Sequence, residues 1–552
     1  MVGRSAVVAI VLLAVVLLAP GVAHAHEGDG DAVTMEGTLE FRHSDDFRNR
    51  IARYYYSLRQ GSRHVTLEFP RFRRDLRNGA RLRVRGTLQH GRLSVEHLRR
   101  LHREPIRTLA ATGPGQRRVV VLLVNFSNNT SQPYTPAQAA ATMFGGPTSV
   151  SSYFREESYG ATTLSGDVFG WYTLPVANSG CAIDAWTQAA NAAATAAGVV
   201  LTNYQHVVYA FPLASSCGFS GLAEMPGSRV WVNGPFTLRV LGHELSHNLG
   251  VHHAASLNCT SGVVRVSLSD TCSYNEYGDP FDIMGSSARH TSSWHKGQIG
   301  WVDPLAQQTV TTSGTYTITP QEWASGGVQA LRVARGTTGN YLYLEYRRPY
   351  GTSFDTFSVS DPVVNGVTIR MAPDYSLMQL SYLIDATSTT SSYADAALAV
   401  GQTFTDGAYD ISIKTTSISA TGATVEIRLP SSPVPAAPAD TSASAPPRAP
   451  PTNIALPTIA GTTQQGSTLT AAVRTWAGAG PMKFTFRWLR CNSYRICSAI
   501  GSATASTYKL TRRDVGRTIR VAVTASNTAG SATATSATTA TIRASSARRR
   551  RR

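Results

Sequence analysis

The feature that most constrains the fold is the segment His243–His253, which carries histidines and a glutamate at fixed spacings in a chain of 552 residues. Apolar residues before it predict a helix, and on a helix His243 and His247 lie one above the other on one face. Gly250 can adopt the left-handed conformation that ends a helix, so the chain can turn back towards that face. The spacing H-E-x-x-H-x-x-G-x-x-H therefore predicts a zinc site whose third ligand is His253.

Two neighbours of these ligands also matter for the predicted chemistry. Glu244 is adjacent to the first ligand and is predicted to be the general base of a metal-assisted hydrolysis. His252 is the rival of His253 for the third position, but the spacing from Gly250 favours His253. A bare H-E-x-x-H also occurs by chance on helices that bind no metal, so it is the longer pattern that supports the site.

A turn-rich segment, Tyr277–Gly285, follows the histidines and supports the same interpretation. It places Met284 about thirty residues downstream, where a methionine turn is expected beneath the metal. Taken alone, Met284 would be read as filler of an apolar core. Ser286 stands where a further tyrosine ligand would lie, so we expect three histidines and one water around a four-coordinate ion.

On these residues, the stretch 117–305 resembles the gametolysin family of metzincin zinc peptidases. Beyond the histidine pattern, the resemblance rests on four short motifs, at residues 149–160, 218–224, 277–280 and 295–301. It implies a secreted zinc endopeptidase with an α/β catalytic domain. It also implies a sheet edge near residues 219–228 that pairs with an extended substrate.

The N-terminal sequence and the cysteines predict an extracellular protein. Residues 1–25 have the basic start, the apolar run and the small-residue cleavage site of a signal peptide, and no later stretch is long and apolar enough to span a membrane. An even number of cysteines in a secreted chain predicts disulfides. Proximity in sequence pairs Cys181 with Cys217, Cys259 with Cys272, and Cys491 with Cys497.

Residues 26–116 are predicted to form a separate, basic, mostly β domain, in the manner of a small barrel. Within it, residues 41–110 contain 18 arginines, no lysine and 6 acidic residues, which gives +12 of the chain's net +17. A propeptide that masks an acidic active-site cleft is the first interpretation, and Arg117–Arg118 offers a basic cleavage site. Because no cysteine lies between the signal peptide and Cys181, masking would require an acidic side chain or steric cover.

Other partners could explain the same charge. An anionic cell-envelope polymer is the second interpretation, and a single-stranded nucleic acid is the least favoured one. Simple solubility is the alternative that needs no partner. Four aspartates recur in later loops, and solvated turns are favoured there over calcium because no EF-hand pattern is present. These residues are Asp385, Asp395, Asp406 and Asp410.

The C-terminal part is predicted to be β-rich. Alternating patterns indicate a β-sandwich over 306–429, a Pro/Ala/Ser-rich linker over 430–455 and an Arg-rich tail over 544–552. Residues 456–543 resemble the immunoglobulin-like repeats of bacterial secreted enzymes, with Trp488 as the core tryptophan.

The complete prediction is a multi-domain protein, with an α/β metzincin-type catalytic domain flanked by an N-terminal small β-barrel-like domain and C-terminal β-sandwich domains. We expect a monomer that hydrolyses extracellular or cell-wall proteins through one zinc ion. The alternative is a secreted surface-binding protein whose zinc site is structural or vestigial. Glu244 disfavours that alternative, because a structural site has no use for a base.

Overall fold

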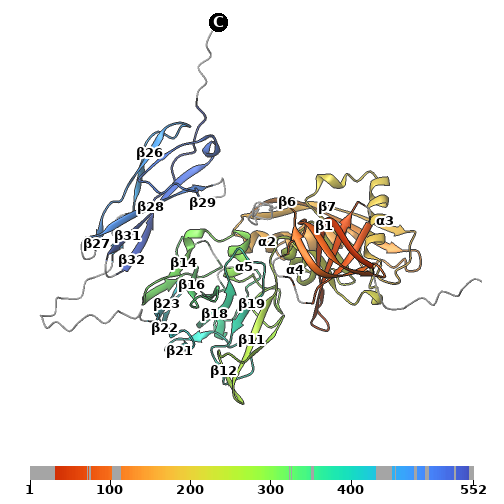
Figure 1. Cartoon of the computed structure of the whole chain (residues 1–552), viewed down its shortest axis with the longest axis horizontal. Helices are drawn as coiled ribbons and strands as arrows, with labels where there is room; N and C mark the ends of the chain where they lie inside the picture. The colour runs from red at the N-terminus through yellow and green to blue at the C-terminus, as the bar shows by residue number, and fades with distance from the viewer. Residues whose placement is uncertain are drawn as a thin grey trace, which may run out of the picture.

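The computed structural model describes residues 31–545 apart from 62, 71–72, 74–75, 102–113, 323, 325, 350–352, 431–450, 454–455, 478–480, 492–496 and 528–529. The predicted signal peptide, most of the linker and most of the arginine tail lie outside these residues. Where the chain is described, it forms several β-sheets and five α-helices, in agreement with the predicted multi-domain, β-rich architecture (Figure 1). None of these helices is long and apolar enough to cross a membrane.

The N-terminal barrel comprises five strands in the order β2-β3-β5-β4-β1, and it closes because β1 also pairs with β2. Leu82 and Val84 point into its core, whereas Arg81, Arg83 and Arg85 alternate with them along β4 and are exposed. The alternation therefore places the basic side chains of this strand on the outer surface of the barrel. The strands are β1 (Asp31–Asp46), β2 (Ile51–Gln60), β3 (Arg63–Glu68), β4 (Arg81–Gln89) and β5 (Arg92–Arg100).

The next part of the chain is an α/β layer with the sheet order β9-β10-β8-β6-β7. Its interior strand β6 is buried from Val119 to Phe126 and runs parallel to both neighbours, as a continuous apolar run predicts. Helix α3 covers one face of the sheet, and α1, α2 and α4 cover the other. Arg117 and Arg118 lie inside β6 and pair with β7, so this dipeptide is not a free loop.

The elements of the α/β layer are β6 (Gly115–Phe126), α1 (Pro136–Phe144), α2 (Val150–Glu157), β7 (Thr162–Leu174), α3 (Ile183–Ala196), β8 (His206–Phe211), β9 (Gly221–Glu224), β10 (Arg229–Asn233) and α4 (Leu238–Asn248).

The barrel and the α/β layer form one continuous ten-stranded sheet. The first half of β1, Asp31–Thr38, pairs with β4 of the barrel. Residues Arg42–Asp45 then pair antiparallel with Gly221–Glu224, which is the whole of β9. The edge strand of the α/β layer is thus covered by the N-terminal barrel.

A second, nine-stranded sheet follows and takes strands from both sides of residue 305. Strand β11 begins directly after His253 and pairs in parallel with β19, as Ala254 faces Ser381. Leu257 and Cys259 of β11 share a core with residues of the later strands. The predicted boundary between 305 and 306 therefore does not separate two independent sheets.

The nine strands are β11 (Ala254–Ser261), β12 (Val264–Val266), β13 (Cys272–Asn275), β14 (Gln307–Val310), β16 (Ala330–Ala334), β17 (Asn340–Glu345), β18 (Gly366–Pro373), β19 (Ser381–Ile384) and β20 (Leu398–Ala399). A four-stranded sheet packs on it, with β15 (Gly314–Ile318), β21 (Thr403–Asp406), β22 (Ile411–Ile418) and β23 (Ala423–Arg428). Helix α5 (Ser293–Ile299) precedes these strands.

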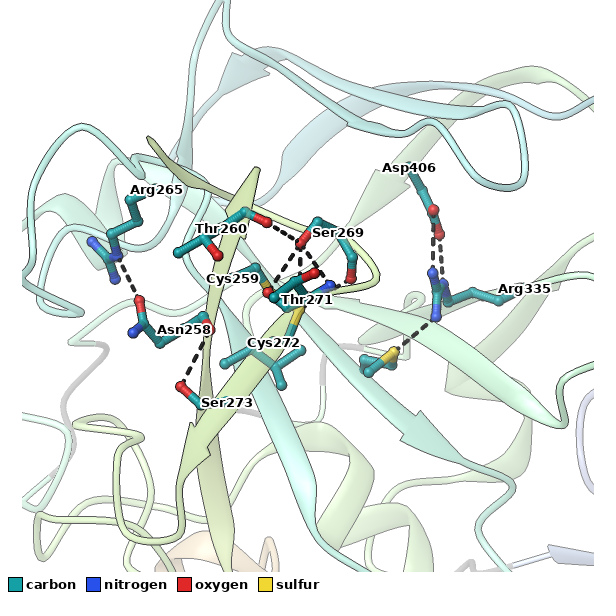
Figure 2. The surroundings of a disulfide bond; sticks show 12 residues. Asn258, Cys259, Thr260, Arg265, Ser269, Thr271, Cys272, Ser273, Arg335 and Asp406 are labelled. Carbon is teal, nitrogen blue, oxygen red and sulfur yellow. Dashed lines mark hydrogen bonds and ion pairs between the residues drawn. A yellow bond between two sulfur atoms is a disulfide. The ribbon is translucent and has the colours of Figure 1, made fainter. Parts of the chain in front are cut away.

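Three disulfides join the pairs that sequence proximity predicts, Cys181–Cys217, Cys259–Cys272 and Cys491–Cys497. Cys259 and Cys272 face each other on β11 and β13 (Figure 2). A cross-link over a loop of this length stabilises by about 3 kcal/mol in the chain-entropy account. The bridge thus braces the hairpin that follows His253.

Two of the aspartates considered for calcium form ion pairs instead. Asp406 accepts hydrogen bonds of 2.5 and 3.2 Å from Arg335 (Figure 2), and Asp385 lies 2.8 Å from Arg265. These contacts occupy the carboxylates with protein cations.

The last described part of the chain is all β, and its core forms around the fully buried Trp488. Its strands are β24 (Thr452–Asn453), β25 (Thr458–Ala460), β26 (Thr468–Ala472), β27 (Trp476–Ala477), β28 (Lys483–Cys491), β29 (Cys497–Ala499), β30 (Thr507–Lys509), β31 (Thr518–Asn527) and β32 (Gly530–Thr535).

Candidate metal centre and active site

Helix α4 and the turn after it bring three histidines together. The rings of His243 and His247 lie one turn apart with centroids separated by 4.7 Å. The helix ends at Asn248 with Leu249 as its C-cap, and Gly250 has a φ of 96°, which only glycine adopts readily. The chain reverses there, and the ring of His253 lies 5.1 Å from each of the other two rings. We call His243, His247 and His253 the histidine triad.

Each ring of the triad is held through its Nδ1 atom. Nδ1 of His243 and of His247 lies 2.8 Å from the carbonyl oxygens of Ile283 and Val251, respectively. Nδ1 of His253 lies 3.0 Å from a carboxylate oxygen of Glu276. Because these acceptors take a proton from Nδ1, they leave the Nε2 lone pairs of the triad for a metal ion.

The Nε2 atoms of the triad fit a metal ion. Among the described residues, all three are buried without a hydrogen-bond partner, an arrangement that is costly unless something else satisfies them. Burial lowers the pKa of His247 to about 4 and that of His243 well below its usual value, so both rings are neutral. Burial also opposes the charge on His253, but the carboxylates of Asp45 and Glu276 raise its pKa to about 9. A bound cation would replace that proton.

Glu244 points into the same space. Both of its carboxylate oxygens are buried without a hydrogen-bond partner in the described chain. Burial, and then the charge of Asp45, raise the pKa of Glu244 well above its usual value. The carboxylate packs so closely on β9 that a Cβ atom on Gly221 would lie 2.0 Å from its Oε1.

A carboxylate from the N-terminal barrel lies between the histidines. Oδ1 of Asp45 is 2.7 Å from Nε2 of His253 and 3.4 Å from Nε2 of His243, and its Oδ2 is 3.4 Å from Nε2 of His247. These atoms are close, yet they are not aligned as hydrogen bonds. Asp45 is completely buried, and His43, His253 and His243 outweigh its burial and hold its pKa well below the usual range.

Two further groups position Asp45. His43 lies 3.0 Å from Oδ2 through its Nδ1, and the hydroxyl of Tyr277 donates to Oδ1 at 2.7 Å. The ring of Tyr277 also lies 4.4 Å from that of His253. The metal-ligating types that gather here therefore include His43 and Asp45 as well as the triad.

His252, the predicted rival for the third ligand, has another contact. Its Nδ1 accepts a hydrogen bond of 2.7 Å from the backbone N–H of His253. Ligand atoms of His252, His253 and Glu276 lie within 4.8 Å of one another, on the far side of His253 from the triad centre defined by Asp45.

Met284 lies in the buried core that also contains residues of α4. Its N–H donates to Asp282 at 2.8 Å, and its carbonyl accepts from Ala254 at 3.0 Å. Asp282 in turn lies 2.9 Å from Nδ1 of His295, and Arg239 of α4 donates to the carbonyls on both sides of Met284. The turn is thus fixed to the triad helix and to α5.

Sequence analysis missed several residues of this site. His43 and Asp45 belong to a stretch with no recognised spacing, some 200 residues before the triad. Glu276 precedes the motif at Tyr277 but carries no pattern of its own. Gly221 falls inside the motif at 218–224, and its close approach to Glu244 becomes visible only in three dimensions.

Residues 118–356 match a family model described as Gametolysin peptidase M11. The match extends past residue 305, consistent with the sheet that crosses this position. Among solved structures, the chain is similar to the crystal structure of neural ectodermal development factor IMP-L2, at 10% identity and a TM-score of 0.11 over 43% of this chain and 90% of that chain, a level that carries no argument. No curated relative matches. Over residues 118–356, the chain is similar to the gametolysin family of metallopeptidases.

Proposed function

We propose that the protein is a secreted, zinc-dependent endopeptidase that hydrolyses peptide bonds of extracellular or cell-wall proteins. The observation that carries this proposal is the convergence of three buried Nε2 atoms beside a carboxylate, Glu244, that has no hydrogen-bond partner in the described chain. Three histidine ligands with a carboxylate base beside them are typical of catalytic zinc sites.

The residues of the site supply the steps of hydrolysis. The triad would hold a zinc ion, which would supply the Lewis acidity needed to activate a water and polarise the scissile carbonyl. Glu244 takes a proton from the attacking water while the oxygen of that water bonds to the carbonyl carbon. When the C–N bond breaks, Glu244 passes this proton to the leaving amine. The hydroxyl of Tyr277, which reaches the centre of the site, is a donor for the carbonyl oxygen.

Strand β9 is the proposed binding edge for the substrate. Its residues Gly221–Glu224 lie next to Glu244, and their backbone groups pair with an extended chain, β1, in this structure. An extended peptide can add to such an edge through main-chain hydrogen bonds. A peptide bound there would pass directly over the triad.

Secretion is supported by the sequence of residues 1–25 and by the three disulfides. Disulfides persist in oxidising compartments and are rare in the cytosol. A peptidase that is active outside the cell meets extracellular proteins, which are therefore its proposed substrates.

The test compares the full chain with Glu244→Gln. Each protein is assayed for casein and gelatin cleavage, before and after brief trypsin treatment followed by trypsin inhibitor. We expect both proteins to bind one zinc, and we expect Glu244→Gln to lose at least about 1,000-fold in kcat because the base is absent. A chelator should abolish cleavage, and added zinc should restore it.

Metal analysis of two neighbouring variants controls the ligand assignment. His253→Ala should lose zinc, whereas His252→Ala should retain it, because only His253 belongs to the triad. Full activity of Glu244→Gln would contradict the proposal, as would cleavage by wild type that a chelator leaves unchanged.

A further inference from the structure

The first observation is that the chain already holds an extended strand in the proposed substrate position. Arg42, His43, Ser44 and Asp45 of β1 face Glu224, Ala223, Leu222 and Gly221 of β9 in antiparallel register. The N–H of Ser220 donates to the carbonyl of Asp45 at 2.7 Å, and the N–H of Met225 donates to the carbonyl of Phe41 at 3.2 Å. The backbone groups with which β9 would bind a peptide are therefore used by β1.

The second observation concerns the side chain that this strand presents to the triad. Both oxygens of Asp45 lie within 3.4 Å of a triad Nε2 atom, which is where a fourth ligand would reach a shared ion. Carboxylates are common zinc ligands beside histidines. His43 and Tyr277 hold the carboxylate from two sides, so its position is fixed by the fold.

The third observation is that neighbouring side chains anchor this strand on the α/β layer. The ring of Phe47 lies 4.8 Å from that of His243. The guanidinium of Arg239 lies 4.4 Å from the centroid of the Phe47 ring. Arg42 forms a 2.6 Å ion pair with Asp184. The hydroxyl of Tyr54, from β2, donates to the carboxylate that anchors His253.

Two contacts fix the barrel further from the triad. Arg53 donates to the carbonyl of Gly218 at 3.0 Å, and Asn78 donates to that of Pro226 at 3.1 Å. They flank β9 on both sides. The barrel is thus docked along the whole length of this edge strand.

From these observations we infer that the N-terminal barrel keeps the peptidase latent, with Asp45 as the fourth ligand of the metal and β1 in place of the substrate. The inference rests on the proposed function. It assigns a metal-binding role to a residue far from the histidine motif. It places a side-chain carboxylate, rather than a peptide carbonyl, at the triad, so we expect β1 to resist cleavage there.

Most of the positive charge of the barrel does not enter the site. The group that enters the site is an acid, although residues 41–110 carry a net +12. Exposed arginines such as Arg81, Arg83 and Arg85 are on the outer surface of β4. Arg42 and Arg53 help to dock the barrel, whereas the exposed arginines of β4 are left for other contacts.

The test uses Co²⁺ as a probe in the full chain, on a Glu244→Gln background that prevents self-cleavage. Asp45→Asn is compared with Asp46→Asn. Asp46 is the matched control because it is the adjacent carboxylate and hydrogen bonds to Asn49. We expect the visible absorption of bound Co²⁺, which reports its ligands, to change in Asp45→Asn and to stay as in the parent in Asp46→Asn.

Acetohydroxamate, a small chelator that needs an open metal position, gives a second readout. If Asp45 fills that position more than nine-tenths of the time, its loss tightens binding by more than about tenfold. Asp45→Ser serves the same purpose should Asp45→Asn fail to fold. An unchanged Co²⁺ spectrum together with unchanged hydroxamate affinity would overturn the inference.

Casein cleavage by unprocessed chains with Glu244 intact completes the test. Wild type and Asp46→Asn should be silent until trypsin treatment, and Asp45→Asn should cleave without it. Equal activity of untreated and trypsin-treated wild type would refute latency and leave the proposed function standing. Absence of Glu244-dependent cleavage in every sample would refute the proposed function, while the Co²⁺ spectra would still decide the role of Asp45.

Discussion

The close contact between Gly221 and Glu244 shows how finely the base is positioned. A Cβ atom at residue 221 would lie 2.0 Å from Oε1 and 2.5 Å from the carboxyl carbon of Glu244. The base must therefore move if this glycine is replaced. Since Gly221 also belongs to β9, this strand and the side chain of Glu244 pack directly against each other.

We predict that Gly221→Ala lowers kcat by about 100-fold, because a catalytic group displaced by about 1 Å loses rate on this scale. Zinc content should stay at one per chain, since the triad does not contact residue 221. The measurement is casein turnover of the trypsin-treated chain with parallel metal analysis. Gly407→Ala is the control because a Cβ atom there meets nothing within 4 Å, and wild-type activity of Gly221→Ala would refute the argument.

At the residue scale, local spacing predicts those site residues that lie on a single helix and the turn after it. His243, Glu244 and His247 follow from helix geometry, and Gly250 shows the positive φ that the pattern requires. Asp45 could not be found in this way, because a residue on one strand reaches the triad only through the pairing of β1 with β9. No sequence spacing encodes that contact.

Among the elements, the C-terminal end of α4 is tied to the sheet beside it. The amide of Asn248 donates to the carbonyls of Glu224 and Arg229 at 2.9 and 3.1 Å, which joins the helix to β9 and β10. Nδ1 of His206, on β8, donates to Asn248 at 2.9 Å. Burial lowers the pKa of His206 to about 4, although this hydrogen bond opposes the shift.

This arrangement predicts a pH dependence of stability. Because the folded pKa of His206 is below its unfolded value, the unfolded state takes up the proton first. The stabilisation is complete above about pH 6.5 and is lost as the pH falls towards 4, by up to about 3 kcal/mol. His206→Gln should flatten the dependence of unfolding free energy on pH across this window.

The measurement is urea unfolding of wild type and His206→Gln at several pH values, followed by fluorescence. Comparison of the two removes the effect of other groups that titrate in the same window. His97→Gln, at an exposed position of the barrel, should behave as wild type does. Parallel curves for wild type and His206→Gln would show that this histidine does not link stability to pH.

Most elements of the α/β layer could be predicted from periodicity and capping. The apolar run at Val119–Phe126 indicates a buried strand, and Ser149 caps α2 through its side chain as its position before a helix suggests. The pairing of β11 with β19 was not predictable, because strands 254–261 and 381–384 meet across more than 100 residues. Periodicity identifies a strand but does not identify its partner.

In the whole molecule, a buried ionic cluster joins the segment 279–290, which contains the methionine turn, to the nine-stranded sheet. Arg347 donates to the carbonyls of Phe281 and His290, and Arg370 donates to Asp279 at 2.7 Å. All of these arginine contacts are completely or almost completely buried. Removing one partner of such a pair costs about 3–5 kcal/mol, since a charge is left buried without compensation.

We predict that a chain ending at residue 305 does not fold into a metal-binding protein. It lacks β19, Arg347 and Arg370, so β11 loses its parallel neighbour and keeps only β12 and β13, and Asp279 loses its counter-charge. A chain ending at residue 429 keeps these contacts and should bind one zinc and cleave casein as the full chain does. Soluble yield and metal content check both truncations, and a soluble, zinc-loaded 1–305 chain would contradict the prediction.

The pairing of β1 with β9 has a consequence for how activity is released. Barrel and peptidase are parts of one polypeptide, so β1 faces β9 at an effective concentration in the millimolar range. Weak contacts are therefore enough to keep β1 paired with β9. One cut between the two units abolishes this advantage without breaking any contact. The freed barrel then competes with substrates at its true, dilute concentration, so that release is nearly complete in a large volume and reversible in a confined one.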